Sequence, residues 1–248
     1  MSRVAVYRKL PSDGACALVD ALKSVGVDAY RARRWPTTEG EVVVCWGTSM
    51  AAVTYPGQRV FNGYRVGNKL EELRLLSRGV PGHGLEFCDA NRAGPPEEDA
   101  WLGRRFYHQS AYDLRETPDG AAEPDFYVRK LNISCEYRVH VFGGKAIRVG
   151  KKMPDPDARS RHEWIRSLET GWIINYGKSW READAARMPE LRRVARAAVK
   201  AVNYDFAAVD LGVENGTGRI VVFETNQAPA LRNFNTALAY AKAIQKEL

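Results

Sequence analysis

Two apolar runs near the C-terminus, joined by a short turn rich in glycine and asparagine, constrain the fold of this chain most strongly. The segment reads FAAVDLGVENGTGRIVVFETN and spans residues 206–226. Its β-branched content predicts two strands, and so short a turn can only join strands that run antiparallel. With the turn at residues 215–218, Asp210 on the first strand falls opposite Glu224 on the second, within reach of a shared ion.

The end of the second strand presents oxygen atoms. Side chains alternate along a strand, so Glu224 and Asn226 share one face, and Asp210 adds a third oxygen-bearing side chain. Two opposed carboxylates are unfavourable without a cation between them. Mg²⁺ prefers one or two carboxylates together with phosphate oxygens and water. The pattern therefore favours a magnesium site, and the structural alternative is a strand-end Asx turn with a solvated Glu224.

The composition is that of a chain that buries an apolar core. Of the 248 residues, 45% are hydrophobic and 27% are charged, which is ordinary for a globular protein. No stretch approaches the roughly 20 apolar residues that cross a bilayer, and the N-terminus has no signal-peptide pattern. The cysteines are scattered without metal-ligand spacing, which predicts free thiols in a reducing compartment. We therefore expect a cytoplasmic protein with no membrane partner.

The formal net charge of +7 points to an anionic partner. ATP, a phosphate-bearing acceptor and nucleic acid all have this property. The basic run ELRRVARAAVK at residues 190–200 is predicted to be a helix whose charged face is solvated. Binding to nucleic acid therefore stays an open alternative.

The remaining segments predict strands and helices arranged around this hairpin. Residues 1–62 contain a strand, a helix and a second strand, which predicts a small α/β lobe with parallel pairing. Asn68 is placed to begin a helix and Gly79 to end it. Gly143-Gly144 tolerates a tight turn, and Pro189 suits the first turn of a helix. Further predicted elements are a loop at 87–100, strands at 101–109 and 125–131, a hairpin at 136–153, and helices at 188–202 and 236–248.

The sequence VDLG at 209–212, followed by FETNQAP at 223–229, resembles the metal-binding end of the ATP-grasp superfamily. Enzymes of this superfamily use ATP to join a carboxylate to an amine or another nucleophile. NKL at 68–70, WLGR at 101–104 and the segment 125–153 are similar to further parts of the family, in the same order along the chain. Compact ATP-grasp proteins of tailed bacteriophages are the most similar type.

The resemblance implies an α/β ATP-grasp fold in three parts. A small N-terminal lobe of the kind that precedes the ATP-grasp region would comprise residues 1–62. A central lid lobe would follow at 63–127, and a C-terminal lobe carrying the metal site at 128–248.

The resemblance also implies roles for charged residues. Asp210, Glu224 and Asn226 would hold one or two Mg²⁺ ions, with Mn²⁺ as a substitute, against the phosphates of ATP. Arg138 matches an arginine that steadies an acyl phosphate, because a guanidinium binds two oxygens at once. The structural alternative for Arg138 is a surface arginine in a hairpin.

Two adjacent lysines compete for the role of a basic phosphate ligand. An ungapped comparison with the family places this ligand at Lys152. A regular two-residue turn instead pairs Glu136 with Lys151 and puts Lys151 on the same side as Arg138, whereas a β-bulge would reverse the two. Both lysines are therefore candidates.

For the nucleotide, the family uses backbone groups of a hinge, here Tyr127, Val128, Lys130 and Leu131. Lys69 and Arg104 would approach the phosphates from the lid. The lid of the family usually carries a glycine-rich loop, but residues 106–116 contain no glycine. Ser110 and its neighbours would then replace the backbone contacts, or the affinity for ATP would be weaker. His108, a lone histidine at a strand end, is more simply a structural hydrogen-bonding residue.

These expectations lead to one function and two alternatives. The leading hypothesis is a Mg²⁺-dependent ligase that converts a carboxylate to an acyl phosphate with ATP and transfers it to an amine or a similar nucleophile. One alternative is a non-catalytic module with the same fold that binds nucleic acid or protein. The other is an ATP-dependent phosphotransferase or nucleotide-modifying enzyme, because a fold does not fix its acceptor.

Overall fold

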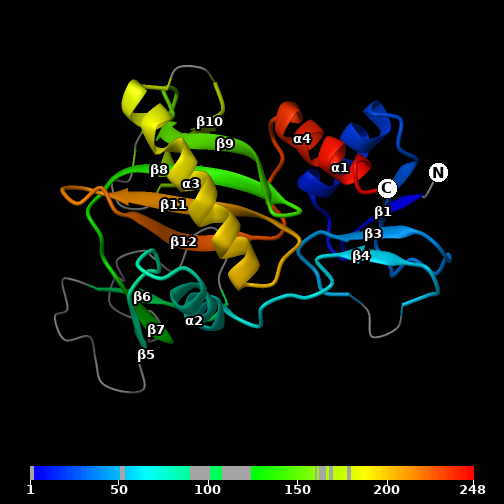
Figure 1. Cartoon of the computed structure of the whole chain (residues 1–248), viewed down its shortest axis with the longest axis horizontal. Helices are drawn as coiled ribbons and strands as arrows, with labels where there is room; N and C mark the ends of the chain where they lie inside the picture. Colours follow the sequence, from blue (N-terminus) through cyan, green and yellow to red (C-terminus); the bar gives the residue numbers. More distant parts are fainter. Residues whose placement is uncertain are drawn as a thin grey trace.

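A computed structural model of the chain describes residues 3–50, 54–89, 101–107, 124–159, 161, 166–167, 170–177 and 180–248. The described residues form three β-sheets with helices packed on them (Figure 1). This architecture confirms the predicted α/β class.

The N-terminal sheet is parallel, as predicted. Helix α1 (Asp13–Ser24) lies beside the C-terminal helix α4 (Phe234–Gln245) (Figure 1). Both helices share a core with the sheet, in which the ring centroids of Trp46 and Tyr240 are 5.7 Å apart. The C-terminal helix therefore completes the N-terminal part of the molecule. The strands, in the order β2-β1-β3-β4, are β1 (Val4–Tyr7), β2 (Ala29–Ala32), β3 (Val42–Cys45) and β4 (Arg59–Phe61).

The central sheet is antiparallel and contains both predicted hairpins. Gly143 and Gly144 form the turn of the first hairpin with φ values of 53° and 69°, which glycine adopts without steric strain. One face of the sheet packs on helix α3 (Glu182–Ala201) through a continuous apolar cluster. The strands, in the order β10-β9-β8-β11-β12, are β8 (Ile133–Phe142), β9 (Lys145–Pro154), β10 (Trp172–Asn175), β11 (Phe206–Glu214) and β12 (Ile220–Asn226).

Helix α3 begins at Glu182, so the prediction of a start near residue 188 is wrong. Pro189 lies two turns inside the helix, and the first turn is instead capped by Asp184, whose side chain accepts the backbone N–H of Arg181 at 3.0 Å. The proline misled the sequence interpretation because it is also favoured at helix starts. The basic run on this helix faces solvent while Leu191 and its apolar neighbours are buried, which confirms the solvated face.

The third sheet has the order β5-β7-β6 and packs on helix α2 (Lys69–Gly79). Residues 87–89 form a strand, so the prediction of a loop is wrong there, and residues 90–100 lie outside the described part of the chain. Both predicted strands of this region are confirmed, with shorter bounds. The strands are β5 (Phe87–Asp89), β6 (Trp101–Arg104) and β7 (Phe126–Arg129).

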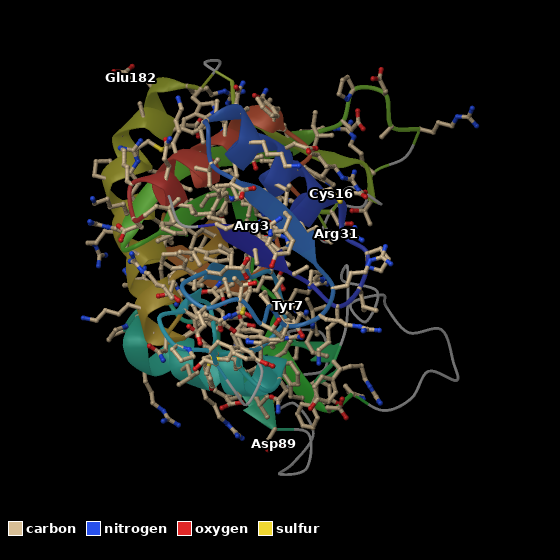
Figure 2. All side chains as sticks on the ribbon, turned by 90° about the vertical axis from the view of Figure 1, so that its right-hand side faces the viewer. Arg3, Tyr7, Cys16, Arg31, Asp89 and Glu182 are labelled. Atoms are coloured by element: carbon tan, nitrogen blue, oxygen red, sulfur yellow. The ribbon has the colours of Figure 1, made fainter. Side chains whose placement is uncertain are left out.

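The side-chain view shows Glu182 at the start of α3 and Asp89 at the end of β5 at opposite ends of the molecule, with Tyr7 of β1 between them (Figure 2). Cys16 of α1 lies beside Arg31 of β2, whose Nη1 is 3.3 Å from the sulfur. All four cysteines are free thiols, as predicted. None of the helices in the described ranges is long and apolar enough to cross a membrane.

Candidate active site

A cavity of about 1570 Å³ lies where the three sheets meet. Its lining comes from the face of the central sheet opposite α3, from the third sheet, and from loops after β1 and β3. Most residues predicted from the sequence are brought together there. Those that line the cavity are Lys69, Arg104, Val128, Lys130, Leu131, Arg138, Lys152, Asp210, Glu224 and Asn226.

Asp210 and Glu224 face each other across β11 and β12, which confirms the predicted register at this pair. Both oxygens of Asp210 accept hydrogen bonds from Arg138, at 2.6 Å from Nε and 2.7 Å from Nη2. Lys152 Nζ lies 3.4 Å from Asp210 Oδ2. Lys69 Nζ lies 3.0 Å from Glu224 Oε2. Each carboxylate is therefore neutralised by a cation of the chain itself.

These ion pairs fix the protonation states of the site. Burial would raise the pKa of Asp210, but Arg138 and Lys152 hold it well below its usual value. Lys69 lowers the pKa of Glu224 to about 2, against the opposing effects of burial and Asp210. Burial would likewise lower the pKa of Lys69, but Glu224 and Glu72 hold it above its usual value. The argument that two opposed carboxylates require a metal ion is therefore wrong, because lysine and arginine already supply the positive charge.

The donor set still suits Mg²⁺ in one specific way. The described residues contain no cluster of three or more His, Cys, Asp and Glu side chains that could hold a metal ion by themselves. Asn226 Oδ1 accepts the backbone N–H of Ala228 at 2.8 Å, so the Asx turn weighed as an alternative is present. Ionised Glu224 and the carbonyl oxygen of Asn226 are hard donors of the type that Mg²⁺ shares with phosphate oxygens. The residues fit a metal ion that arrives with a nucleotide.

The register of the β8–β9 hairpin decides between the two lysines. A bulge between His140 and Val141 shifts the pairing, so Lys152 lies on the face of Arg138 and bonds Glu136 at 2.9 Å. Lys151 lies on the opposite face, where its Nζ is 2.7 and 2.8 Å from the oxygens of Asp184. The pairing of Glu136 with Lys151 is therefore wrong, and Lys151 does not line the cavity.

Lys69 is the first residue of helix α2 and lines the cavity. Asn68 begins the helix by accepting the backbone N–H of Glu71 at 2.9 Å, as predicted. Glu72, a residue that sequence reasoning missed, is 5% exposed. It bonds Lys69 at 3.0 Å and accepts hydrogen bonds from the backbone N–H and hydroxyl of Thr225. The sequence offered one signal for this role. Glu72 lies beside the apolar residues of the helix, and a glutamate is rarely buried there unless it has partners.

One end of the cavity is apolar and is formed by Leu102 and Val128 of the third sheet, together with Leu85 and with Phe223 of β12. Strand β7 is paired on both sides, so the backbone of Tyr127 and Val128 is engaged in the sheet. Beyond the end of β7, Lys130 and Leu131 also line the cavity. Tyr127 itself points to the other face of β7 and does not line it.

Arg104, at the end of β6, lines the cavity and contributes to the low pKa of Glu224. Ser110 and His108 lie outside the described residues, as does most of the lid loop.

Further residues that the sequence did not single out line the cavity or contact its lining. His140 is fully buried, with its ring nitrogens 3.1 Å from Tyr240 Oη and 2.9 Å from Tyr176 Oη. Tyr176 lines the cavity. Arg8 and Arg65 line its end near the N-terminal sheet.

The architecture identifies the class of fold. Along its whole length the chain matches a structure of the ATP-grasp ligase PsnB complexed with a minimal precursor, with a TM-score of 0.66 and 16% identity, covering 100% of both chains. The chain therefore has the ATP-grasp fold. No family model and no curated protein sequence matches it.

Two further solved structures show how widely the fold is shared. The macrocyclase MdnC from Microcystis aeruginosa MRC, bound with the precursor peptide MdnA, matches with a TM-score of 0.54 and 11% identity over 99% of this chain and 100% of that one. The D-alanine–D-alanine ligase from Bacillus anthracis matches with a TM-score of 0.57 and 10% identity over 100% and 99% of the two chains. At these identities the likeness concerns the fold.

Proposed function

We propose that the chain is an ATP-dependent ligase that activates a carboxylate as an acyl phosphate and joins it to an amine or another nucleophile. One observation carries the proposal. Lys69 of α2, Arg138 of β8 and Lys152 of β9 converge in a single cavity on two ionised carboxylates of β11 and β12. Such fixed, alternating charges suit a triphosphate accompanied by a divalent cation.

The nucleotide would lie between the third sheet and β12. The apolar side chains of Leu102, Val128 and Phe223 suit a planar base, and the backbone of Lys130 and Leu131, which line the cavity beyond β7, would bond the edge of the base. Lys69 and Arg104 would then meet the phosphates, because both line one recess together with Val128, Phe223 and Glu224. Glu224 and Asn226 would hold Mg²⁺. When bound, the ion withdraws charge from the γ-phosphoryl group.

Arg138 and Lys152 would act on the transferred group. A substrate carboxylate oxygen forms a bond to the γ-phosphorus while the bond from that phosphorus to the bridging oxygen of ADP breaks. The nucleophile then forms a bond to the acyl carbon, and inorganic phosphate leaves with the oxygen that joined it to the carbon. Arg138 is held rigidly by Asp210 at two of its nitrogens. Its position costs little reorganisation when charge develops nearby.

Hydroxylamine tests this proposal without knowledge of the natural nucleophile, because it converts an acyl phosphate to a stable hydroxamate. We expect the protein with MgATP, hydroxylamine and a panel of carboxylic acids to release ADP and form a hydroxamate from the same acid. Arg138→Lys should reduce both rates while nucleotide affinity changes little, because lysine keeps the charge but loses the two-pronged geometry. ADP release without any hydroxamate would contradict the ligase and favour a phosphotransferase.

A further inference from the structure

The N-terminal end of the cavity lies at a change of direction in the parallel sheet. From β1 the chain moves to β2 on one side and later to β3 on the other, so the connections diverge between β1 and β3. Ligands of open parallel sheets bind at the carboxyl ends of the strands at such a point. Arg8 follows β1 directly, Gly47 follows β3 by one residue, and both line the cavity.

The guanidinium of Arg8 is held in place by two backbone carbonyl groups. Its Nη1 donates to the carbonyl oxygens of Trp46 at 3.0 Å and Gly47 at 3.1 Å. Its Nε is buried and has no hydrogen-bond partner among the residues that the structure describes. Gly47 has a φ of +66°, and a Cβ there would lie 2.3 Å from Arg8 Nη1. A buried charged donor left without an acceptor is unfavourable, so this guanidinium, which lines the cavity, is a candidate anion-binding group.

A second guanidinium converges on the same point. Arg65 Nη1 lies 3.4 Å from the same carbonyl oxygen of Gly47. Burial lowers the pKa of Arg8, and the charge of Arg65 lowers it further. The cavity cations Lys69, Arg138 and Lys152 each pair with a carboxylate. Neither Arg8 nor Arg65 forms an ion pair with any residue in the described part of the chain.

This arginine pair belongs to the same cavity as the carboxylates. The loop after β12 connects the two regions: Gln227 Nε2 donates to the carbonyl oxygen of Tyr64 at 2.7 Å, and a Cβ on Gly47 would lie 2.6 Å from the Cβ of Ala228. The cavity volume of about 1570 Å³ also exceeds the roughly 300–1,000 Å³ of a site for one small ligand. Room therefore remains for a substrate beside a nucleotide.

We propose that Arg8 and Arg65, which we call the arginine subsite, bind an anionic group of a substrate, a carboxylate or a phosphate, that is not altered in the reaction. The inference rests on the proposed function, because it assigns the remaining end of the same cavity to a substrate. It limits the substrate class to molecules with at least one anionic group besides the reacting carboxyl. An oxyanion between the two guanidinium groups relieves their repulsion and accepts hydrogen bonds from their N–H groups that face the cavity.

The signal of the Arg8 Nε–H group reports binding directly. The protein is labelled with ¹⁵N-arginine and saturated with ADP and Mg²⁺, and the Arg8→Lys variant identifies the Arg8 signal by its loss. Glutarate and methyl phosphate are the probes for the carboxylate and phosphate sources, and the uncharged diamide of glutarate is the control ligand. We expect at least one anion to shift the signal in a saturable manner and the diamide to leave it unchanged. If glutarate binds more tightly, the anionic group of the substrate is a carboxylate, and if methyl phosphate binds more tightly, it is a phosphate.

Variants of two exposed arginines distinguish specific binding at the arginine subsite from a general attraction of anions to the positively charged protein. Arg65→Gln should weaken binding of the anion about tenfold, the loss expected for one charge-assisted hydrogen bond. Arg78→Gln removes another exposed charge, on α2 and outside the cavity lining, and should leave the affinity unchanged. Equal affinity in wild type and Arg65→Gln, or an Arg8 signal that neither anion moves, would overturn the inference.

The affinity for ADP is measured in the same samples and tests the proposed function separately. If ADP binds and no anion shifts the Arg8 signal, the arginine subsite is wrong and the nucleotide site stands. If the anions bind at Arg8 without any ADP affinity, the subsite stands and the proposed ligase is wrong.

Discussion

Arg138 and Asp210 form a largely buried ion pair in the cavity, with side chains only 17% and 7% exposed. Lys152 adds a second cation on the same carboxylate. When side chains are this buried, the loss of one partner lowers the free energy of unfolding more than the repulsion between Asp210 and Glu224 does. The reason is that the remaining charges keep their desolvation penalty.

Asp210→Ala should therefore lower the free energy of unfolding by about 3 kcal/mol, since it leaves Arg138 and Lys152 without their shared partner. Urea denaturation without nucleotide measures the effect. The matched control is Glu214→Ala, which removes a more exposed carboxylate paired with Arg219 and should cost less than about 1 kcal/mol. An increase in stability for Asp210→Ala would show that repulsion between the carboxylates dominates.

His140 makes stability depend on pH. Burial, together with the charge of Arg138, lowers its pKa to about 3, whereas an unfolded histidine titrates near 6.5. The unfolded state therefore binds the proton first as pH falls, so the free energy of unfolding decreases on acidification. Between pH 7 and pH 5 the expected loss is about 2 kcal/mol. The lowered pKa values of Asp210 and Glu224 act below this window.

The variant His140→Gln should remove this slope between pH 7 and pH 5, as measured by urea denaturation at several pH values. A wild-type slope in His140→Gln would mean that another group controls the acid sensitivity.

Among the elements, two β-bulges determine which side chains reach the cavity. One lies in β8–β9 between His140 and Val141, and the other in β11–β12 between Asp210 and Leu211. A shift of one residue moves every following side chain to the other face of a strand. Lys152 therefore faces the cavity, and Lys151 faces α3.

The adjacent lysines give a matched pair of variants. Lys152→Met should weaken binding of a non-hydrolysable ATP analogue with Mg²⁺ by about tenfold, because it removes one charge-assisted contact. Lys151→Met should leave this affinity unchanged but lower the melting temperature. The variant loses the two bonds from Lys151 to Asp184 that connect the start of α3 with the sheet. Calorimetry and thermal denaturation of both variants check this. The reverse assignment of the two effects would contradict the register.

Local patterns predicted most of these elements. Gly143-Gly144 and the turn after Glu214 mark the hairpins, and Asn68 marks the start of α2, because such signals depend on nearby residues alone. The bulges, the burial of Glu72 and the start of α3 depend on packing between distant segments, which one sequence does not display. The pairing of Asp210 with Glu224 was predictable, but the three cations that neutralise them come from other elements.

For the whole molecule, the C-terminal segment joins the parts. The loop after β12 packs so closely on the start of α1 that a Cβ on Gly14 would lie 2.7 Å from the carbonyl oxygen of Pro229. Helix α4 then covers the N-terminal sheet, where Phe206 and Tyr240 contact Trp46. Such packing indicates that the N-terminal lobe depends on the end of the chain. The domain boundaries at 62 and 127 stay a prediction.

Removal of residues 234–248 should expose the apolar face of the N-terminal sheet. We expect the backbone amides of β1 and β3 to lose their protection from hydrogen exchange, while those of β8 and β11 keep theirs. A shorter truncation of residues 246–248 leaves α4 whole and should preserve protection throughout. Unchanged protection of β1 after the longer truncation would show that the N-terminal lobe folds by itself.

The central claim is that this cavity binds ATP with Mg²⁺ held at Glu224. Calorimetric titration with a non-hydrolysable ATP analogue, with and without Mg²⁺, tests it most directly in wild type and in Glu224→Gln. We predict one nucleotide per chain, wild-type affinity at least about tenfold tighter with Mg²⁺, and loss of this Mg²⁺ effect in Glu224→Gln. No binding in wild type, or the same Mg²⁺ effect in Glu224→Gln, would contradict the account.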